Sequence, residues 1–380
     1  MATASGRSAV RAAVQGGLWA AAGLGAALSG LLWVCGPALM VVMGVDAAVV
    51  PLAMAYVKIR SSVMALQLCG MACNAALLGL QDSRTSFAVT VAAAAANLLG
   101  DWYLCGVRGA GLRGAALATA ASLVLYCGLQ MLVLHNKGVL PPLAAFRRLP
   151  TKKVATDMAS YCGPYSFAMF TRVAGVMLVT SFAARVGALP LAAHQILMAV
   201  FYFLAAFGEP LGQAAQAMVP RILGGRDGRR EAFSFAAVLG QICCCAALLL
   251  GTAAAGVLKW GPGLFAASLE VQAALQELAP MMFGVLFFSS VNVVIDGLLL
   301  GLKDLKGIMA LVCLSSSAQL ACLFLFGLPG KFGLAGVWVA MLARLVAWFL
   351  AGIPRILVVF RGMDEGGKGG EEGWAALKTA

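Results

Sequence analysis

Charged residues are scarce in this chain: Asp, Glu, Lys and Arg make up 11% of its 380 residues, while 62% are hydrophobic. A soluble globular protein carries about 25% charged residues, so this composition does not fit a chain folded in water. Histidine is scarcer still, with two in the chain, and none of the 11 cysteines forms a CxxC pair. These absences argue against a zinc site and against a membrane-embedded enzyme, whose known chemistries need convergent His, Asp or Ser–His sets.

Long apolar runs are abundant instead, and they are long enough to cross a bilayer. Lipid offers no partner for free backbone amides, so such runs must form helices or a closed barrel. The runs are continuous rather than alternating, which excludes the barrel. We therefore expect an all-α polytopic membrane protein embedded in a lipid bilayer. The ten expected spans are residues 12–35, 48–80, 86–105, 112–134, 158–184, 189–223, 232–258, 270–302, 307–327 and 334–360.

The net charge of +12 comes largely from bases in short stretches between the apolar runs. No aromatic residues interleave with them, so we expect no nucleic-acid partner. Cytosolic loops of membrane proteins are enriched in Lys and Arg, and most loop bases share one side if both chain ends lie there. The opposite side then receives Arg108, Arg113, Arg185, Lys259 and Lys331. This bias predicts ten helices with both ends on the cytosolic or stromal side.

An internal repeat appears at one constant offset along the chain. The segment GLQD at 79–82 matches GLKD at 301–304 (301 − 79 = 222), GLRG at 111–114 matches GLAG at 333–336, and GR at 6–7 matches GR at 228–229. An even number of helices separates equivalent points, so the two halves share one orientation. Parallel repeats of this kind are a transporter architecture with the substrate path between the halves.

The repeat also predicts the domain organisation. We expect an incomplete N-lobe of four helices at 1–134, a basic linker at 135–157, a C-lobe of six helices at 158–361 and a polar tail at 362–380. Because the N-lobe has two helices fewer than the C-lobe, we expect that the first two helices of the N-lobe are missing from the start of the chain. Residues 1–30 also resemble a transit peptide, although the repeat and the long apolar core favour a spanning helix there.

Several motifs resemble those of the multidrug and toxic compound extrusion (MATE) transporter family. The segments YVKIR at 56–60 and GLQDSRT at 79–85 are similar to its DinF-like branch, and AAHQ at 192–195 is similar to a motif of the whole family. The segment GEPLGQAAQ at 208–216 resembles plant plastid-envelope members. IDG at 295–297 and GLAGVW at 333–338 resemble motifs of the family's second half.

This resemblance implies two six-helix lobes around a central cavity. It implies an antiporter that exports small organic solutes by alternating access, coupled to H⁺ or Na⁺ and without another cofactor. The plant-like segment further implies the plastid envelope, with the plasma membrane or another organelle as alternatives, and an aromatic or anionic substrate. We expect a monomer. Two other readings stay open: a flippase of the same superfamily for a lipid-linked substrate, and a truncated, inactive relative.

Two carboxylates are predicted inside the membrane, where an ionised side chain costs about 2.5–3.5 kcal/mol and therefore needs a partner or a function. Asp296 lies near the end of its apolar run and follows Asn292 by one turn, and the family uses an acid at the matching position for cation coupling. Glu209 precedes Pro210 in the middle of an expected long helix, where proline would produce a kink that can face a cavity. We expect Asp296 and Glu209 to couple cation movement, with packing roles as the alternative.

Further residues are predicted to line the substrate cavity. Arg172 is an isolated base in its span, where many family members have a carboxylate; it could attract an anionic substrate or pair with one of the two carboxylates. His194 can titrate near neutral pH, with a hydrogen-bonded structural role as the alternative. Asp101 is interpreted as an interfacial anchor at a helix end. By helical spacing or by repeat position, the cavity set includes Asn292, Gln213, Gln216, Gln195, His194, Arg172 and Asn74.

Overall fold

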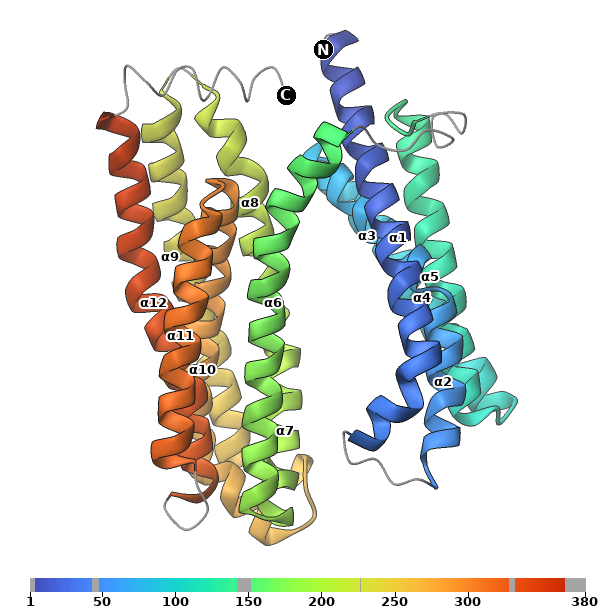
Figure 1. Ribbon diagram of the computed structural model, residues 1–380. Coiled ribbons are helices and arrows are strands. Elements are labelled where there is room, and N and C mark those ends of the chain that lie inside the picture. The colour runs from blue at the N-terminus through green and yellow to red at the C-terminus, as the bar shows by residue number, and fades with distance from the viewer. Residues whose placement is uncertain (1–3, 43–47, 142–151, 226, 328–331, 366–380) are drawn as a thin grey trace. The chain divides into compact units, whose positions relative to one another are not determined.

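Every element of the described chain is a helix (Figure 1). The computed structural model describes residues 4–42, 48–141, 152–225, 227–327 and 332–365. These residues divide into two compact units, Met1–Ala159 and Ser160–Ala380. The all-α class predicted from composition is confirmed.

The first unit is built from four successive helical spans. They are formed by α1 (Ala4–Val42), α2 (Val50–Ser62) with α3 (Met64–Gly79), α4 (Ser83–Asp101) with a π-helix (Trp102–Val107), and α5 (Gly111–Asn136). Helices α2 and α3 meet at a bend of 45° and together are long and apolar enough to count as one candidate span. Helices α1, α3 and α5 pack around a small core that contains Cys69, Cys73 and Cys127, which behave there as small hydrophobic residues.

The second unit contains six spans. They are α6 (Lys152–Val186), α7 (Ala188–Ala205) with α8 (Glu209–Leu223), α9 (Gly228–Trp260), α10 (Leu269–Gly301), α11 (Leu305–Phe326) and α12 (Gly333–Glu365). A short 3₁₀ turn, Pro262–Leu264, lies between α9 and α10. Over the described residues, nine helices are long and apolar enough to cross a membrane, or ten when α2 and α3 count as one span. The division into an N-lobe of four spans and a C-lobe of six stays a prediction.

Three predicted boundaries differ from the helices that form. The linker expected at 135–157 is shorter, because α5 runs to Asn136 and α6 already begins at Lys152; residues 142–151 lie outside the described chain. Helix α12 continues to Glu365, four residues into the expected tail, and residues 366–380 are not described. The span expected to kink at Pro210 is instead interrupted at 206–208. Pro210 occupies the first turn of the new helix α8, where its missing N–H costs no hydrogen bond.

The internal repeat is visible in the backbone as a pair of matching turns. Gln81 and Lys303, 222 positions apart, are the two non-glycine residues with positive φ in the described chain, at 61° and 56°. The same two backbone hydrogen bonds close both turns, as in a Schellman motif. The next residue, Asp82 or Asp304, then accepts a hydrogen bond from a backbone N–H of the following helix, at 3.1 Å in each case. The two turns have the same backbone conformation although their sequences differ, which supports descent of the two halves from one repeated unit.

Helix α10 is the centre of the second unit and packs against α7, α8, α9 and α12. Glycine makes the closest of these approaches possible. A Cβ at Gly297 of α10 would lie 2.1 Å from the carbonyl oxygen of Gly212 on α8, and a Cβ at Gly212 would lie 2.6 Å from that of Val293. The two backbones therefore touch through small residues, which is the usual way for helices to associate where no hydrophobic effect drives them together.

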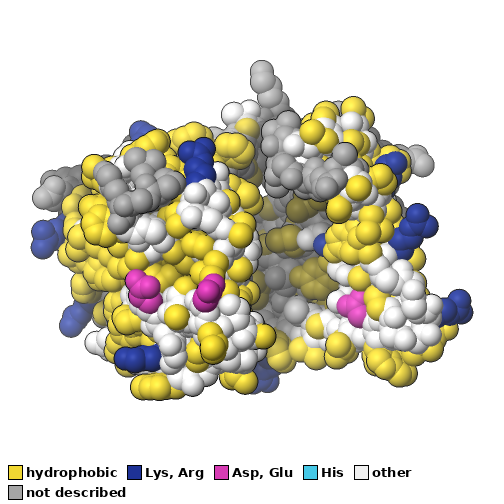
Figure 2. All heavy atoms as spheres, turned by 90° about the horizontal axis from the view of Figure 1, so that it is seen from below, with side chains coloured by type: hydrophobic (Ala, Val, Ile, Leu, Met, Phe, Trp, Pro, Cys, Tyr) yellow, Lys and Arg dark blue, Asp and Glu magenta, His cyan; other side chains and the backbone are white. Residues whose placement is uncertain are grey.

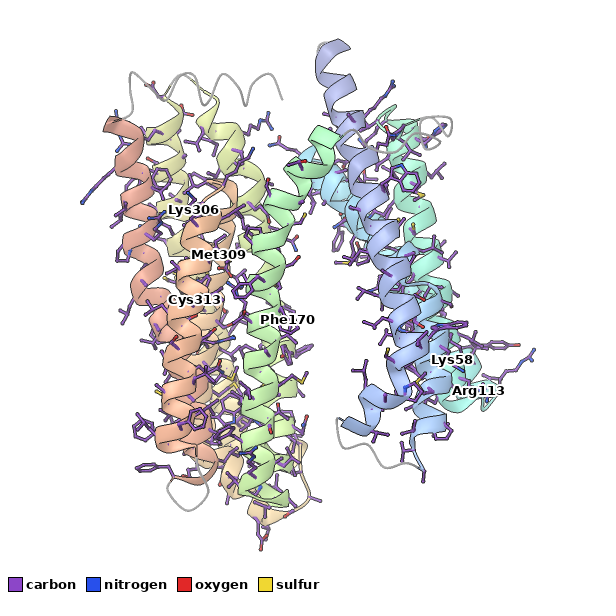
Figure 3. The ribbon with its side chains drawn as sticks, in the orientation of Figure 1. Lys58, Arg113, Phe170, Lys306, Met309 and Cys313 are labelled. Carbon is purple, nitrogen blue, oxygen red and sulfur yellow. The ribbon has the colours of Figure 1, made fainter. Side chains whose placement is uncertain are left out.

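Large apolar side chains cover the outer faces of both units. Val34 of α1 is 81% exposed, Phe170 of α6 75% and Leu249 of α9 70%. In the end-on view of Figure 2, hydrophobic side chains dominate the surface and charged ones are few. Figure 3 shows Phe170 on α6, and Lys306, Met309 and Cys313 following one another along α11. A surface of this kind suits lipid rather than water.

Asp82→Asn is expected to lower the thermal stability of the protein in a pH-dependent way. Asn keeps the cap of α4 but loses the ion pair with Lys137, in which the nitrogen and carboxylate oxygen lie 2.7 Å apart. Hydrogen bonds from Lys137 and then from Thr85 lower the pKa of Asp82 from 3.8 to about 2. A lowered pKa stabilises the fold above the unfolded value, and this contribution is lost as pH falls through the folded value.

Thermal unfolding in detergent should therefore show a full difference between wild type and D82N above about pH 4, which disappears towards pH 2. A difference that stays constant through this pH range would contradict the assigned role of the ion pair.

Candidate functional site

A cavity of about 310 Å³ lies among helices of the second unit. Side chains from α6, α7, α8, α10, α11 and α12 form its wall. Of the residues predicted for the transport site, Asp296, Glu209, Asn292 and Arg172 line it, although their roles stay predictions. The full polar lining consists of Arg172, Tyr202, Glu209, Ser289, Asn292, Asp296, Ser315 and Arg344.

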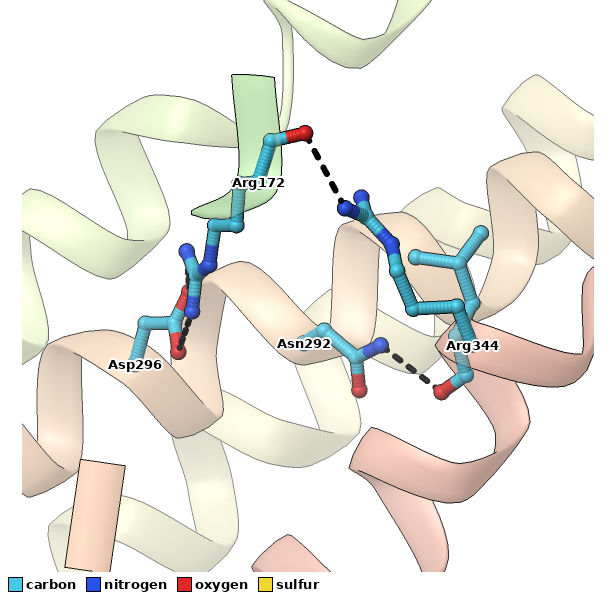
Figure 4. A network of polar contacts seen from close by, with 5 residues as sticks. Arg172, Asn292, Asp296 and Arg344 are labelled. Atoms are coloured by element: carbon cyan, nitrogen blue, oxygen red, sulfur yellow. Dashed lines mark hydrogen bonds and ion pairs between the residues drawn. The ribbon is translucent and has the colours of Figure 1, made fainter. Parts of the chain in front are cut away.

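Arg172 and Asp296 form a two-pronged ion pair across the cavity wall (Figure 4). Nη1 of Arg172 lies 2.6 Å from Oδ2 of Asp296, and Nη2 lies 2.9 Å from Oδ1. Their side chains are 24% and 20% exposed. Paired hydrogen bonds between a guanidinium and a carboxylate are among the strongest in proteins, and each charge removes the other's need for water. The sequence left open whether Arg172 pairs with Asp296, with Glu209 or with substrate, and the structure shows the first of these.

The flat face of Arg172 is held by an aromatic ring. Its guanidinium carbon lies 4.4 Å from the ring centroid of Trp348 on α12, which is close enough for a cation–π interaction. Arg172 is thus fixed at its edge by Asp296 and over its face by Trp348. We infer that this side chain is ordered before any ligand arrives.

Arg344 is the second cation of the cavity. Its Nη1 donates a hydrogen bond of 3.3 Å to the main-chain oxygen of Arg172 (Figure 4). Within the part of the chain that the structure describes, no carboxylate forms an ion pair with it. Arg344 was not among the site residues predicted from the sequence. An arginine inside an apolar span was the available signal, and the same signal did identify Arg172.

A glycine makes room for Arg344. A Cβ at Gly175 of α6 would lie 2.5 Å from Oε1 of Gln319 on α11 and 3.3 Å from Nη1 of Arg344. Gln319 is buried and also donates to the backbone oxygen of Gly175. Any larger residue at 175 would push one or both of these polar side chains away from α6.

Asn292 has one satisfied and one unsatisfied end. Its Nδ2 donates to the main-chain oxygen of Leu345 at 2.9 Å. That bond requires the amide nitrogen on that side, so the oxygen is the end that remains. Oδ1 of Asn292 is buried without a partner in the described chain, and the residue is 6% exposed.

Glu209 is the second carboxylate of the cavity and the first residue of α8. A carboxylate in the first turn of a helix is favoured by the helix dipole. It lies close enough to Arg172 and Tyr165 to interact with both electrostatically. It is exposed, and the described residues form no ion pair with it.

Three predicted glutamines do not line this cavity of the second unit, and their place in a central cavity between two lobes stays a prediction. Gln213 and Gln216 follow Glu209 along α8 and are exposed, and Gln195 on α7 is exposed as well. The expectation assumed one continuous helix, along which spacing keeps these residues on the same face. The break at 206–208 ends that register, so the relation between Gln195 and Glu209 no longer follows from spacing.

His194 and Asn74 are also elsewhere. His194 is fully buried, its Nε2 lies 3.1 Å from Oγ1 of Thr180, and its ring packs edge-on against Trp338. Asn74 belongs to the first unit, where it bonds to Ser86 and Gln130. Neither residue lines the cavity of the second unit.

A second polar cluster lies in the first unit, at the end of α4. Nδ2 of Asn97 donates to Oδ2 of Asp101 at 3.2 Å, and the hydroxyl of Ser122 donates to Oδ1 of Asn97 at 3.3 Å. Oδ1 of Asp101 is buried and has no partner among the described residues. Helix α4 ends at Asp101, as expected, and a π-helix continues the chain to Val107. The role of Asp101 as an interfacial anchor stays a prediction. Its carboxylate lies in a polar cluster between α4 and α5.

Comparison with known proteins identifies relatives over most of the chain. The family model described as MatE matches residues 4–103 and 164–319. The chloroplastic protein DETOXIFICATION 47 of Arabidopsis thaliana is 28% identical over 300 residues, which are 78% of this chain and 54% of the relative. The uncharacterized transporter YisQ of Bacillus subtilis is 25% identical over 329 residues, or 83% and 70% of the two chains. The chain spans about half the length of the plant relatives it matches.

Solved structures agree on the fold. An outward-facing multidrug resistance MATE family transporter of the MOP superfamily superposes with a TM-score of 0.77 at 17% identity, covering 93% of this chain and 86% of the other. A MOP superfamily transporter from Pyrococcus furiosus, described as having a binding pocket of reverse polarity, gives 0.80 at 17% identity with the same coverage.

Arg172→Gln is expected to destabilise the protein, because Asp296 would keep its charge in the bundle without a counter-ion. Breaking a buried ion pair on one side costs about 3–5 kcal/mol, and partial exposure to the cavity reduces this to roughly 1–3 kcal/mol here. Arg172→Gln combined with Asp296→Asn removes both charges and should recover much of the loss. Thermal unfolding of the two single variants and the double variant measures this coupling. A loss of stability in the double variant equal to the sum of the two single losses would contradict it.

Proposed function

The chain belongs to the MatE family of membrane transporters, and on that basis we propose that it exports small organic solutes as a secondary active transporter. Export is coupled to the movement of H⁺ or Na⁺ in the opposite direction. The family is one of transporters and not of enzymes, and the helices form an integral multi-pass membrane protein. The cavity of the second unit is the part of the transport path that the described residues provide.

The observation that carries this proposal is a charged cavity inside an apolar helical bundle. Two arginines and two carboxylates line it, although each charge within a membrane is costly and purely structural helices avoid them. Its volume of about 310 Å³ is in the lower part of the range for small-molecule sites. The four charges balance, so the cavity is not strongly basic. This balance favours a small organic solute over the lipid-linked substrate of a flippase.

Three carboxylates are candidates for ion coupling. We keep Asp296 and Glu209, which share the cavity with the solute, and add Asp101 in the first unit. Asp296 is held by Arg172, so it can exchange a proton or cation only when that pair opens. Asp101 has a buried oxygen without a partner in the described chain, and such a carboxylate can accept a proton or a cation without breaking an ion pair.

The membrane is proposed from the relatives. DETOXIFICATION 47 and DETOXIFICATION 45 of Arabidopsis thaliana are both described as chloroplastic. The bias of loop bases towards the side of the chain ends suits a stromal location of that side. We therefore propose the plastid envelope.

Export can be tested in proteoliposomes with an imposed proton gradient. Radiolabelled 4-hydroxyphenylacetate and tetraethylammonium serve as anionic and cationic solutes, and empty liposomes as the control. We expect gradient-driven movement of at least one solute. Asp101→Asn should reduce proton-driven movement roughly tenfold or more, because the amide cannot take up a proton in place of the carboxylate.

Asp296→Asn and Glu209→Gln should each alter the dependence on the gradient as well. Unchanged coupling in all three variants would remove these carboxylates from the mechanism. No movement of either solute by correctly folded protein would favour the inactive relative.

A further inference from the structure

The cavity of the second unit contains one cation, Arg344, that is not part of the ion pair between Arg172 and Asp296. Both oxygens of Asp296 are occupied by the two Nη atoms of Arg172. Arg344 lines the same cavity, and among the described residues its guanidinium makes a single hydrogen bond, to a main-chain oxygen. Its guanidinium has five N–H donors, so most of its donor capacity faces no acceptor in the described chain. An arginine in this position can bind a carboxylate of a ligand.

An independent observation lies beside Arg344 in the chain. Asn292 is held by the backbone of Leu345, the residue that follows Arg344, and its Oδ1 is a buried acceptor with no partner among the described residues. Asn292 is 6% exposed and lines the cavity. A buried polar atom left unpaired costs about 1–3 kcal/mol, so such atoms in a cavity commonly mark a ligand contact. This acceptor requires an O–H or N–H donor.

Neighbouring residues make room for the guanidinium of Arg344 and hold it in place. Gly175 leaves the space in which Nη1 of Arg344 and Oε1 of Gln319 lie against α6. Gln319 is 2% exposed and anchored to the backbone of Gly175. The guanidinium is therefore positioned between its own helix α12 and α6 before a ligand binds, which lowers the entropy cost of binding.

We propose that Arg344 and Asn292 form a subsite for a small organic carboxylate that also carries a hydroxyl or amine. The carboxylate binds the free donors of Arg344, and the hydroxyl or amine donates to Oδ1 of Asn292. A cation is disfavoured here, because Arg172 already fills the coordination of Asp296. Glu209 remains at the start of α8, where it interacts with Arg172 rather than with this subsite. The inference rests on the proposed function, since it names the substrate class of the same cavity.

Equilibrium binding to the full purified chain in detergent tests the subsite apart from transport. The probes are phenylacetate, 4-hydroxyphenylacetate and phenethylamine, which share one ring and differ in charge or in one hydroxyl. We expect both carboxylates to bind, the hydroxylated one more tightly, and the amine to bind more weakly than either. Arg344→Gln should weaken binding of both carboxylates roughly 10- to 100-fold, as for the loss of a charged hydrogen bond.

Matched variants separate recognition from folding. Arg361→Gln, on the same helix but at its exposed far end, should leave binding unchanged. Arg344→Lys keeps the charge without the fork and should lose less affinity than Arg344→Gln. Asn292→Ala should abolish the advantage of 4-hydroxyphenylacetate over phenylacetate. Thermal unfolding confirms that each variant is folded.

Two results would overturn the proposal. One is tighter binding of phenethylamine than of the carboxylates to wild-type protein. The other is that folded wild-type protein binds no carboxylate, or that folded Arg344→Gln binds the carboxylates as tightly as wild type does. Carboxylate binding without export in proteoliposomes would refute the transport function but leave the subsite standing. The two claims therefore fail separately.

Discussion

The ion pair between Arg172 and Asp296 is the interaction on which the cavity of the second unit depends. Either charge alone would be strongly unfavourable in an apolar bundle, and two parallel hydrogen bonds of 2.6 and 2.9 Å stabilise both charges. The consequence for function comes from the charged side chains of the cavity that are not part of this pair. With Asp296 occupied, Arg344 and Glu209 are the charges that a solute or a coupling ion can reach. The pair thus sets the polarity that the cavity offers.

The two units use one backbone plan with different chemistry. Both have the same turn before a capping aspartate, at residues related by the offset of 222. Yet the interior positions differ, because neutral groups in the first unit stand where the second has charged or longer ones. The pairs at this offset are Asn74 with Asp296, Asn97 with Gln319, and Ser122 with Arg344. The carboxylate of the first unit that has a buried oxygen lies elsewhere, at Asp101, and the units are not interchangeable halves.

Much of this fold followed from the sequence, and less of the site did. Apolar runs and base distribution predict the spans because membrane solvation acts on every residue in the same way. The possible pairing of Arg172 with Asp296 followed from the cost of lone charges. Spacing could not predict the break before Glu209, since proline is compatible with a kink or with a new helix start. It also could not predict Arg344 in the site, because its position depends on space that Gly175 leaves on another helix.

The most direct test of the account is a crystal structure of the protein with 4-bromophenylacetate, in which anomalous scattering locates the bromine. The account predicts one bromine site inside the cavity of the second unit, with the carboxylate on Arg344 and the Arg172–Asp296 pair intact. A bromine site outside this cavity, or a carboxylate that has displaced Asp296 from Arg172, would contradict it.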